Sequence, residues 1–280
     1  MRLLVTGAAG MLGRDVTAAA PRAGHDVTPL SRRELDVADA AAVRAAIAAA
    51  RPDAVVNCAA WTDVDGAEAS EETATAINGT GAGNVAAAAA AAGAFCVQLS
   101  TDYVFDGAAA SPYVESSPTG PIGAYGRSKL AGERAVAAAA PGGHAIVRSS
   151  WLFGEHGRNF VATMLRLASE RDALTVVDDQ VGCPTFTRHL ATALIEIAER
   201  RLAGIRHVAG AGQCSWYDLA AAAFAATGAA VELRRGRTAD LGRPAPRPAY
   251  SVLRSERPDT PVLPPWQDGL NAYLQLGVTA

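Results

Sequence analysis

The chain has 280 residues, half of them hydrophobic and 19% of them charged, with a formal net charge of −3. This composition excludes a disordered chain. It also lacks the strongly basic balance typical of proteins that bind nucleic acid or an anionic membrane surface, so we expect neither partner. A chain of this length can bury a large core without disulfide or metal staples.

Cysteine usage and hydropathy bear on the compartment. The four cysteines contain no C-x-x-C pair, which argues against a zinc or redox motif, and we expect no metal. They are Cys58, Cys96, Cys183 and Cys214. Buried, inert thiols would suit a reducing compartment. No secretory signal pattern follows Met1, and the uncharged stretch 73–101 is dominated by weakly apolar alanine. We therefore expect a cytoplasmic protein that does not span a membrane.

The first half alternates short apolar runs with alanine-rich stretches. The apolar runs predict strands at 3–5, 26–28, 54–57, 95–99 and 145–147. The stretches between them predict helices from about residue 12, at 40–50, at 82–92 and at 125–140. Strands separated by helices indicate an α/β fold with a Rossmann-type, doubly wound parallel sheet.

After residue 150 the rhythm becomes less regular. Helices are predicted at 160–169, 190–201 and 215–227, the last with Ser215 as N-cap. We expect an NADP(H)-binding Rossmann domain at 1–150 and a smaller α/β, mainly substrate-binding domain at 151–280, with interleaving of the two left open. An arginine-rich segment at 234–247 predicts either surface charges or a contact to an anionic ligand group.

A glycine turn follows the first strand and opens the first helix. Gly7 suits the tight turn, Gly10 lets backbone approach a pyrophosphate, and Gly13 lets helix and strand pack closely. The free N–H groups at the start of a helix attract phosphate. This context predicts a dinucleotide site.

The end of the second strand indicates which dinucleotide binds. An NAD site usually carries an acidic residue there for the ribose 2′-hydroxyl. This chain has Ser31, Arg32 and Arg33 instead, which suit a 2′-phosphate, unless the arginines are only surface charges. NADP(H) is therefore favoured over NAD(H), and Asp36 could accept a hydrogen bond from the adenine amino group.

Three residues form a candidate catalytic set. Thr101 ends the fourth strand, and Tyr125 and Lys129 are four apart on a predicted helix, so they share one face. Reduction of a ketone by hydride needs a proton donor. An ammonium beside a phenol is expected to lower the pKa of the phenol towards working pH, where acid catalysis is efficient.

Several longer motifs carry a family resemblance. They include GAAGMLG (7–13), STDYVFDG (100–107), YGRSKLAGE (125–133), RSSWLFG (148–154) and DQVGCPT (179–185). On these, the chain resembles the extended short-chain dehydrogenases/reductases, and within them the dTDP-4-dehydrorhamnose reductase family. The resemblance covers nearly the whole chain.

The resemblance implies NADPH-dependent reduction of the 4-keto group of dTDP-4-dehydro-L-rhamnose, with NADH used less favourably. Tyr125 would donate the proton, Lys129 would orient the cofactor, and Thr101 would tune Tyr125. The cofactor contacts would be Gly10, Met11, Leu12, Ser31, Asp36, Val37, Ala60, Trp61 and Thr62, with Ala59 beside them. The substrate contacts would be Thr101, Asp102 and Trp151, with Asn159 and Arg247 towards the diphosphate.

The sequence departs from the family at a metal site. Some members dimerise through Mg²⁺ held by glutamates, and the matching positions here are Asp15 and Arg188. Since Mg²⁺ takes oxygen donors, an arginine makes a metal-bridged dimer doubtful. Monomer and homodimer both stay open.

Two other functions fit the same motifs. One is a related reductase of antibiotic deoxysugar synthesis, of the dihydrostreptose type. The other is a non-catalytic, NADP-binding regulatory subunit, which the intact Thr101, Tyr125 and Lys129 set disfavours.

Overall fold

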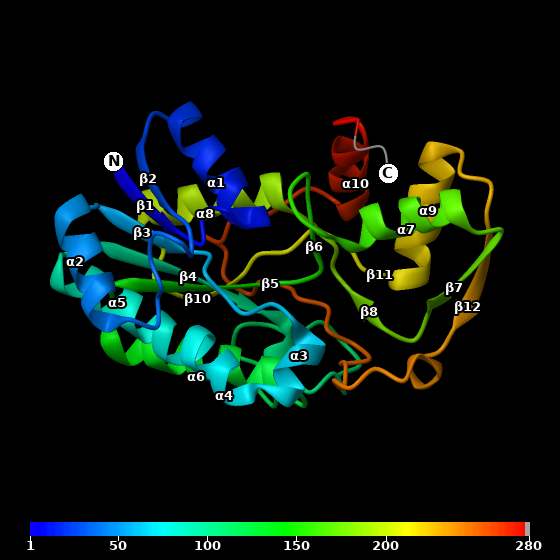
Figure 1. The fold of residues 1–280 in the computed structure, drawn as a ribbon, viewed down its shortest axis with the longest axis horizontal. Coiled ribbons are helices and arrows are strands. Elements are labelled where there is room, and N and C mark those ends of the chain that lie inside the picture. The colour runs from blue at the N-terminus through cyan, green and yellow to red at the C-terminus, as the bar shows by residue number, and fades with distance from the viewer. Residues whose placement is uncertain (278–280) are drawn as a thin grey trace.

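A six-stranded parallel sheet forms the centre of the computed structural model, which describes residues 1–277 (Figure 1). The strand order is β10-β5-β4-β3-β1-β2. The strands are β1 (Arg2–Thr6), β2 (Asp26–Leu30), β3 (Ala54–Asn57), β4 (Phe95–Thr101), β5 (His144–Ser149) and β10 (Gly204–His207). All of their pairings are parallel. The order reverses between β1 and β3, which is where open α/β sheets bind ligands.

Helices cover both faces of this sheet. One face carries α1 (Met11–Arg22) and α8 (Thr187–Arg200), and the other carries α2 (Ala40–Ala50), α5 (Ala82–Ala91) and α6 (Ala124–Ala139) (Figure 1). Successive strand residues point to opposite faces. Leu3 and Val5 therefore pack in the core under α1, whereas Leu4 packs in the core under α2 and α5. The doubly wound α/β prediction is confirmed.

A smaller, less regular region follows residue 150. Its helices are α7 (Phe160–Glu170), α9 (Trp216–Thr227) and α10 (Trp266–Leu274). Its strand pairs are β6 (Leu152–Phe153) with β9 (Thr185–Phe186), β8 (Val181–Gly182) with β11 (Cys214–Ser215), and β7 (Ala173–Val177) with β12 (Glu232–Gly236). A short 3₁₀ helix spans Thr238–Leu241. Aromatic and aliphatic side chains of α7, α9 and α10 form its own core.

Two elements beyond residue 150 nevertheless belong to the larger region around the six-stranded sheet. α8 packs on α1 over the β1 face, and β10 is an edge strand of the sheet. The sequence predicts most of α8 but not β10. The helices of the segment after β3 were also not predicted, namely α3 (Val64–Ala69), α4 (Glu71–Thr75) and a π-helical turn (Ala76–Gly81).

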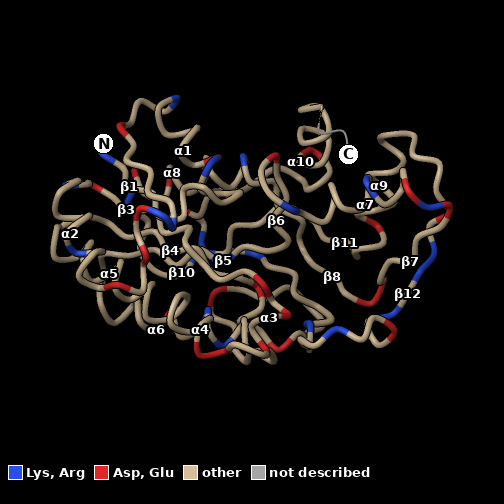
Figure 2. Tube along the Cα trace, viewed as in Figure 1, with Lys and Arg blue, Asp and Glu red and all other residues tan. Residues whose placement is uncertain are grey.

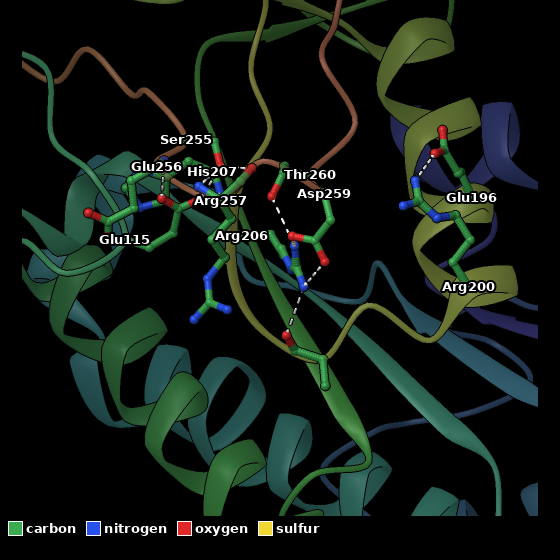
Figure 3. Close-up of polar contacts among 11 residues, drawn as sticks. Glu115, Glu196, Arg200, Arg206, His207, Ser255, Glu256, Arg257, Asp259 and Thr260 are labelled. Atoms are coloured by element: carbon green, nitrogen blue, oxygen red, sulfur yellow. Dashed lines mark hydrogen bonds and ion pairs between the residues drawn. The ribbon is translucent and has the colours of Figure 1, made fainter.

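The edge strand β10 is covered by the segment that precedes α10. Figure 3 shows Arg206 of β10 directed at Asp259 and Thr260, and His207 beside Glu115. Glu115 accepts hydrogen bonds from His207 N at 2.9 Å, Ser255 Oγ at 2.5 Å and Glu256 N at 2.8 Å. Covering an edge in this way prevents pairing with another chain.

The arginine-rich segment lies among acidic residues, and Figure 2 shows basic and acidic positions mixed along β7 and β12. Arg234 pairs with Glu232 at 2.8 Å, and Arg235 pairs with Asp178 while its guanidinium lies 4.0 Å from the Tyr217 ring centroid. These arginines are surface charges, the first of the two predicted alternatives.

The four cysteines are free thiols. Cys96, Cys183 and Cys214 are buried, as predicted, and Cys58 is half-buried. No helix within residues 1–277 has the length and apolar character needed to cross a bilayer.

The predicted N-cap of α9 is confirmed and yields a stability test. Ser215 Oγ accepts from Asp218 N at 3.0 Å, and Asp218 accepts from Ser215 N at 3.1 Å. We expect Ser215→Ala to lower the free energy of unfolding by about 1 kcal/mol, because the backbone N–H of Asp218 loses its acceptor. Ser70→Ala is the matched control, since Ser70 stands at the N-cap of α4 without a side-chain bond. Urea unfolding of both variants checks this, and equal losses would contradict it.

Candidate active site

A cavity of about 620 Å³ lies at the carboxyl edge of the large sheet, where the strand order reverses. Most of the residues predicted for the cofactor and the catalytic step line it. They are Gly7, Gly10, Met11, Leu12, Arg32, Asp36, Val37, Ala59, Ala60, Trp61, Thr62, Thr101, Asp102, Tyr125, Lys129 and Trp151. Five predicted residues do not line it, namely Gly13, Ser31, Arg33, Asn159 and Arg247.

The glycine turn has the tight geometry that its sequence predicted. Gly7 has φ +64°, and a Cβ there would lie 2.6 Å from Ala59 N. A Cβ on Gly13 would overlap Gly7 O, so Gly13 allows α1 to pack closely although it does not face the cavity. No side chain caps the first turn of α1. The free N–H groups of that turn can therefore receive a phosphate.

The segment after β3 is held by Asn78, a residue that sequence analysis missed. Asn78 Oδ1 accepts from Trp61 N at 2.9 Å, and its Nδ2 donates to Trp61 O at 3.1 Å and to Ser128 Oγ at 2.9 Å. Asn78 lies in the π-helical turn, a feature often found at functional sites. This clamp fixes Ala60 and Trp61 at the cavity wall, next to α6.

At the end of β2, Arg32 faces the cavity and Ser31 does not. Ser31 N donates to Glu34 Oε2 at 2.7 Å, and this hydrogen bond lowers the pKa of Glu34. Of the two predicted arginines, only Arg32 lines the cavity, and Arg33 does not.

The three candidate catalytic residues come together at one wall. Tyr125 and Lys129 lie one turn apart on α6, and Thr101 ends β4 beside them. Lys129 Nζ donates to Leu99 O at 2.7 Å. The Tyr125 ring meets the Tyr103 ring edge-on, with centroids 5.7 Å apart.

The expected acidification of Tyr125 is wrong for the protein without bound ligands. The pKa of Tyr125 is raised to about 12, chiefly by burial and also by the charge of Asp102, while a hydrogen bond with Thr101 acts in the opposite direction. The penalty for a buried phenolate outweighs any gain from Lys129, whose ammonium is directed at Leu99 O. Tyr125 therefore carries its proton at neutral pH, which is the form that a proton donor needs.

Two buried polar atoms in the cavity wall lack a partner within the described chain. They are Asp102 Oδ2 and Ser149 Oγ. Ser149 was missed, although it pairs in register with Thr101 at the end of β5. Unpartnered buried polar groups are rare and costly, and a catalytic role or a bound water or ion commonly explains them. Both residues line the cavity, which suits a polar ligand.

Trp151 closes the cavity on the side of the smaller region. Its ring stacks on Trp216 with centroids 3.5 Å apart, and a Cβ on Gly182 would lie 2.5 Å from the same ring. Trp151 also has φ +49°, a strained backbone for a bulky residue. Such strain clusters at ligand sites and persists where packing over-determines it.

The two candidates for the diphosphate end are engaged elsewhere. Asn159 is buried as the N-cap of α7, accepting from Ala162 N at 2.9 Å. Arg247 donates to both carboxylate oxygens of Asp65, at 3.1 and 3.0 Å. Arg158, which sequence analysis missed, lines the cavity instead. The sequence feature that could have identified Arg158 is its position directly before the predicted Asn159.

The doubtful Mg²⁺ site has a poor donor set. Arg188 Nε lies 3.8 Å from Asp15 Oδ1, and the same guanidinium pairs with Glu155. The guanidinium of Arg188 therefore already neutralises the carboxylates that a Mg²⁺ ion would need as ligands. Nowhere in residues 1–277 do three His, Cys, Asp or Glu side chains group as a metal site would require.

The parallel sheet, the glycine turn and the Thr101, Tyr125 and Lys129 set define a Rossmann-fold short-chain dehydrogenase/reductase. The family model described as "RmlD substrate binding domain" matches residues 1–278, and the chain belongs to this family.

Relatives support the same assignment. The chain is 49% identical to a dTDP-4-dehydrorhamnose reductase of Streptomyces griseus, over 91% of this chain and 86% of that one. It is 43% identical to a dTDP-4-keto-6-deoxy-D-glucose reductase of Streptomyces niveus, over 99% and 92%. A crystal structure of dTDP-4-dehydrorhamnose reductase from Bacillus anthracis in complex with NADP matches with a TM-score of 0.95 and 36% identity, covering 98% of this chain and 99% of that one.

Asp102 gives a pH-dependent prediction. Burial raises the pKa of Asp102 to about 6, well above that of an unfolded aspartate, so the ionised side chain destabilises the fold above pH 6 and this cost fades as the pH falls through 6. We expect Asp102→Asn to raise the melting temperature at pH 7.5 and to have a smaller effect at pH 5. Asp36→Asn, at an exposed position, is the control. A stabilisation that does not change with pH would argue against buried charge.

Proposed function

We propose that the protein reduces the 4-keto group of dTDP-4-dehydro-L-rhamnose with NADPH, giving dTDP-L-rhamnose. The observation that carries the proposal is the convergence of Thr101, Tyr125 and Lys129 on one cavity, beside the unpartnered Asp102 and Ser149 atoms. The relatives named as dTDP-4-dehydrorhamnose reductases support the substrate class.

The residues present fit a dinucleotide. The uncapped first turn of α1 and the glycine turn would hold the pyrophosphate, and Arg32 would meet the 2′-phosphate of NADP(H). Arg158 lines the same cavity. It lies near the start of α1, because a Cβ on the neighbouring Gly157 would be 4.0 Å from Met11 Cβ. We propose NADP(H) as the preferred cofactor, with NAD(H) used less well and no Mg²⁺.

Bound NADPH would supply hydride to the keto carbon. The side chains of this protein then manage the proton and the charge. Tyr125 Oη holds its proton at neutral pH and donates it to the oxygen of the former ketone, which becomes a hydroxyl. The Thr101 hydroxyl, beside Tyr125, helps to position that oxygen. The Lys129 ammonium stabilises the tyrosinate that remains.

The substrate side combines polar and aromatic contacts. Asp102 and Ser149 offer hydrogen bonds to sugar hydroxyls, and the Trp151 ring, stacked on Trp216, presents an apolar wall. Asn159 and Arg247 would act indirectly, by fixing the start of α7 and the loop near Asp65.

A second candidate is reduction of a related dTDP-linked keto sugar. The relative named dTDP-4-keto-6-deoxy-D-glucose reductase favours it, and a dihydrostreptose-type activity belongs to the same class. Turnover with purified keto sugars would decide between these substrates. NADPH binding without turnover on any of them would favour the regulatory role.

We also propose a cytoplasmic location, as the four free thiols suit a reducing compartment. Residues 1–150 would form the core of the NADP(H)-binding domain and residues 151–280 mainly the substrate-binding domain, with α8 and β10 interleaved into the former. We propose a monomer or a homodimer without a metal bridge.

Loss of the proton donor tests the reaction. We expect Tyr125→Phe to lower kcat by about 10²–10⁴, because general acid catalysis contributes that much, while NADPH still binds. The assay follows nicotinamide absorbance with dTDP-4-dehydrorhamnose. Tyr250→Phe is the control, since its hydroxyl bonds Gln213 outside the cavity. Undiminished turnover by the Tyr125 variant would refute the mechanism.

Substitutions of Arg32 and of its neighbour Arg33 test which residue determines the preference for NADPH over NADH. We expect Arg32→Ala to raise the KM for NADPH about tenfold or more, because a charge-assisted hydrogen bond of roughly 1.5–3 kcal/mol is lost, and to leave the KM for NADH unchanged. Arg33→Ala should change neither, as Arg33 does not face the cavity. Steady-state kinetics with both cofactors measures this, and equal effects of the two variants would contradict it.

A further inference from the structure

Lys129 is the only lysine among the 280 residues, and it is 4% exposed. A buried ammonium loses its hydration, and this loss must be offset by nearby partners. Its direct partner is the neutral carbonyl of Leu99 at 2.7 Å. A carboxylate that compensates the charge must come from elsewhere in the core.

Glu133 occupies the required position. It follows Lys129 by four residues on α6, so the two side chains are neighbours on one helix face. Glu133 is also 4% exposed, and its Oε1 accepts from Ser100 Oγ at 2.5 Å. Lys129 and Glu133 thus bind consecutive residues of β4, Leu99 and Ser100, directly before Thr101.

Arg148 of β5 competes for the same carboxylate. Its Nε and Nη2 donate to the two oxygens of Glu133 at 2.9 and 2.7 Å, and it is 2% exposed. Arg148 also contacts His207 Nε2 at 3.4 Å, and its guanidinium lies 5.1 Å from the Phe105 ring centroid. Burial lowers the pKa of His207 to about 4, so this histidine is neutral at pH 7. Glu133 is therefore the direct partner of Arg148, and it acts on Lys129 only as a nearby opposite charge.

We propose that Glu133 is a positioning residue that keeps the Lys129 ammonium charged beside Tyr125, and that Arg148 limits how much of the Glu133 charge reaches Lys129. The consequence for catalysis rests on the proposed function. The charge relation itself is a property of the protein without ligands.

The surroundings of Lys129 support this assignment. Burial lowers the pKa of Lys129 to about 8, while Glu133 and Cys58 act in the opposite direction. The titratable or charged groups around the site are Tyr125 and Glu133 on α6, Cys58 after β3, Asp102 after β4 and Arg148 on β5. Burial raises the pKa of Cys58 to about 12, so Cys58 is an uncharged thiol at neutral pH. Of the two groups that raise the pKa of Lys129, Glu133 is therefore the one that carries a carboxyl group, four residues along α6.

The single lysine makes the test direct. Protein labelled with ¹³C at the lysine ε-carbon gives one lysine signal, whose shift against pH reports the pKa of Lys129 without cofactor or substrate. We expect Glu133→Gln to lower this pKa by about one unit or more, because an opposite charge is removed. We expect Arg148→Met to raise it, because the Glu133 carboxylate loses its competing cation. A merely structural role for the pair would not produce shifts of opposite sign.

Glu71→Gln is the matched control. Glu71 forms a similar two-bond pair with Arg127 of α6, at 2.7 Å for both bonds, but on the exposed side of the helix. This variant should leave the Lys129 signal unchanged. An unchanged Lys129 pKa in Glu133→Gln, or shifts of the same sign in Glu133→Gln and Arg148→Met, would overturn the proposal.

A double variant guards against misfolding of the single ones. Glu133→Gln with Arg148→Met removes both charges together, which buried pairs often tolerate. We expect a Lys129 pKa below that of the wild type, since Glu133 is the helix neighbour of Lys129. A value equal to the wild type in this folded double variant would also overturn the proposal.

The catalytic consequence is a changed pH profile. With a lower pKa, Lys129 loses its proton at a lower pH, so kcat of Glu133→Gln should fall relative to wild type by about tenfold more at pH 8.5 than at pH 6.5. If Tyr125→Phe retains turnover, the proposed reaction fails, but the lysine titration still decides the role of Glu133.

Discussion

The burial of one ammonium at the carboxyl edge of the sheet constrains much of what surrounds it. Lys129 lies under the cavity wall with a carbonyl of β4 as its direct partner. Because a lone buried charge is costly, the fold must bring a carboxylate nearby and satisfy the oxygens of that carboxylate. The hydrogen bonds from Ser100 and Arg148 to Glu133 do this, and they join α6, β4 and β5 beneath Thr101. The same hydrogen bonds therefore compensate buried charge and hold the strand that carries the Thr101 hydroxyl.

Much of the site follows from the sequence because it depends on local spacing. The four-residue interval of Tyr125 and Lys129, and the glycine intervals of the first turn, fix their geometry once a helix or turn forms. The strand ends Thr6, Asn57 and Thr101 reach the same edge because the strands are parallel. Asn57 Nδ2 donates to Gln98 Oε1 at 2.7 Å across these strand ends, so buried polar groups there are satisfied by one another.

The features that sequence missed depend on register or on contacts distant in the chain. Ser149 is opposite Thr101, and Arg148 opposite Ser100, only because β4 and β5 pair in this register. Asn78 reaches Trp61 because a π-helical turn directs its amide there. Asn159 resembled a ligand residue from its motif, but the start of α7 needs its side chain as a cap. The high pKa of Tyr125 arises from burial, which a motif does not encode.

Several unfavourable features of this protein lie in the wall of the cavity. Asp102 and Ser149 have buried atoms without partners, Trp151 has a strained backbone, and Lys129 is buried. Each costs stability, and none is needed for the sheet or its two helical layers, which rest on large apolar cores elsewhere. Other unpartnered atoms and positive-φ residues lie outside the cavity, at Asp15, Arg206, Arg51 and Arg201. Those at the cavity differ in that they lie beside Tyr125, where a bound polar ligand could satisfy the polar groups that the two cores support.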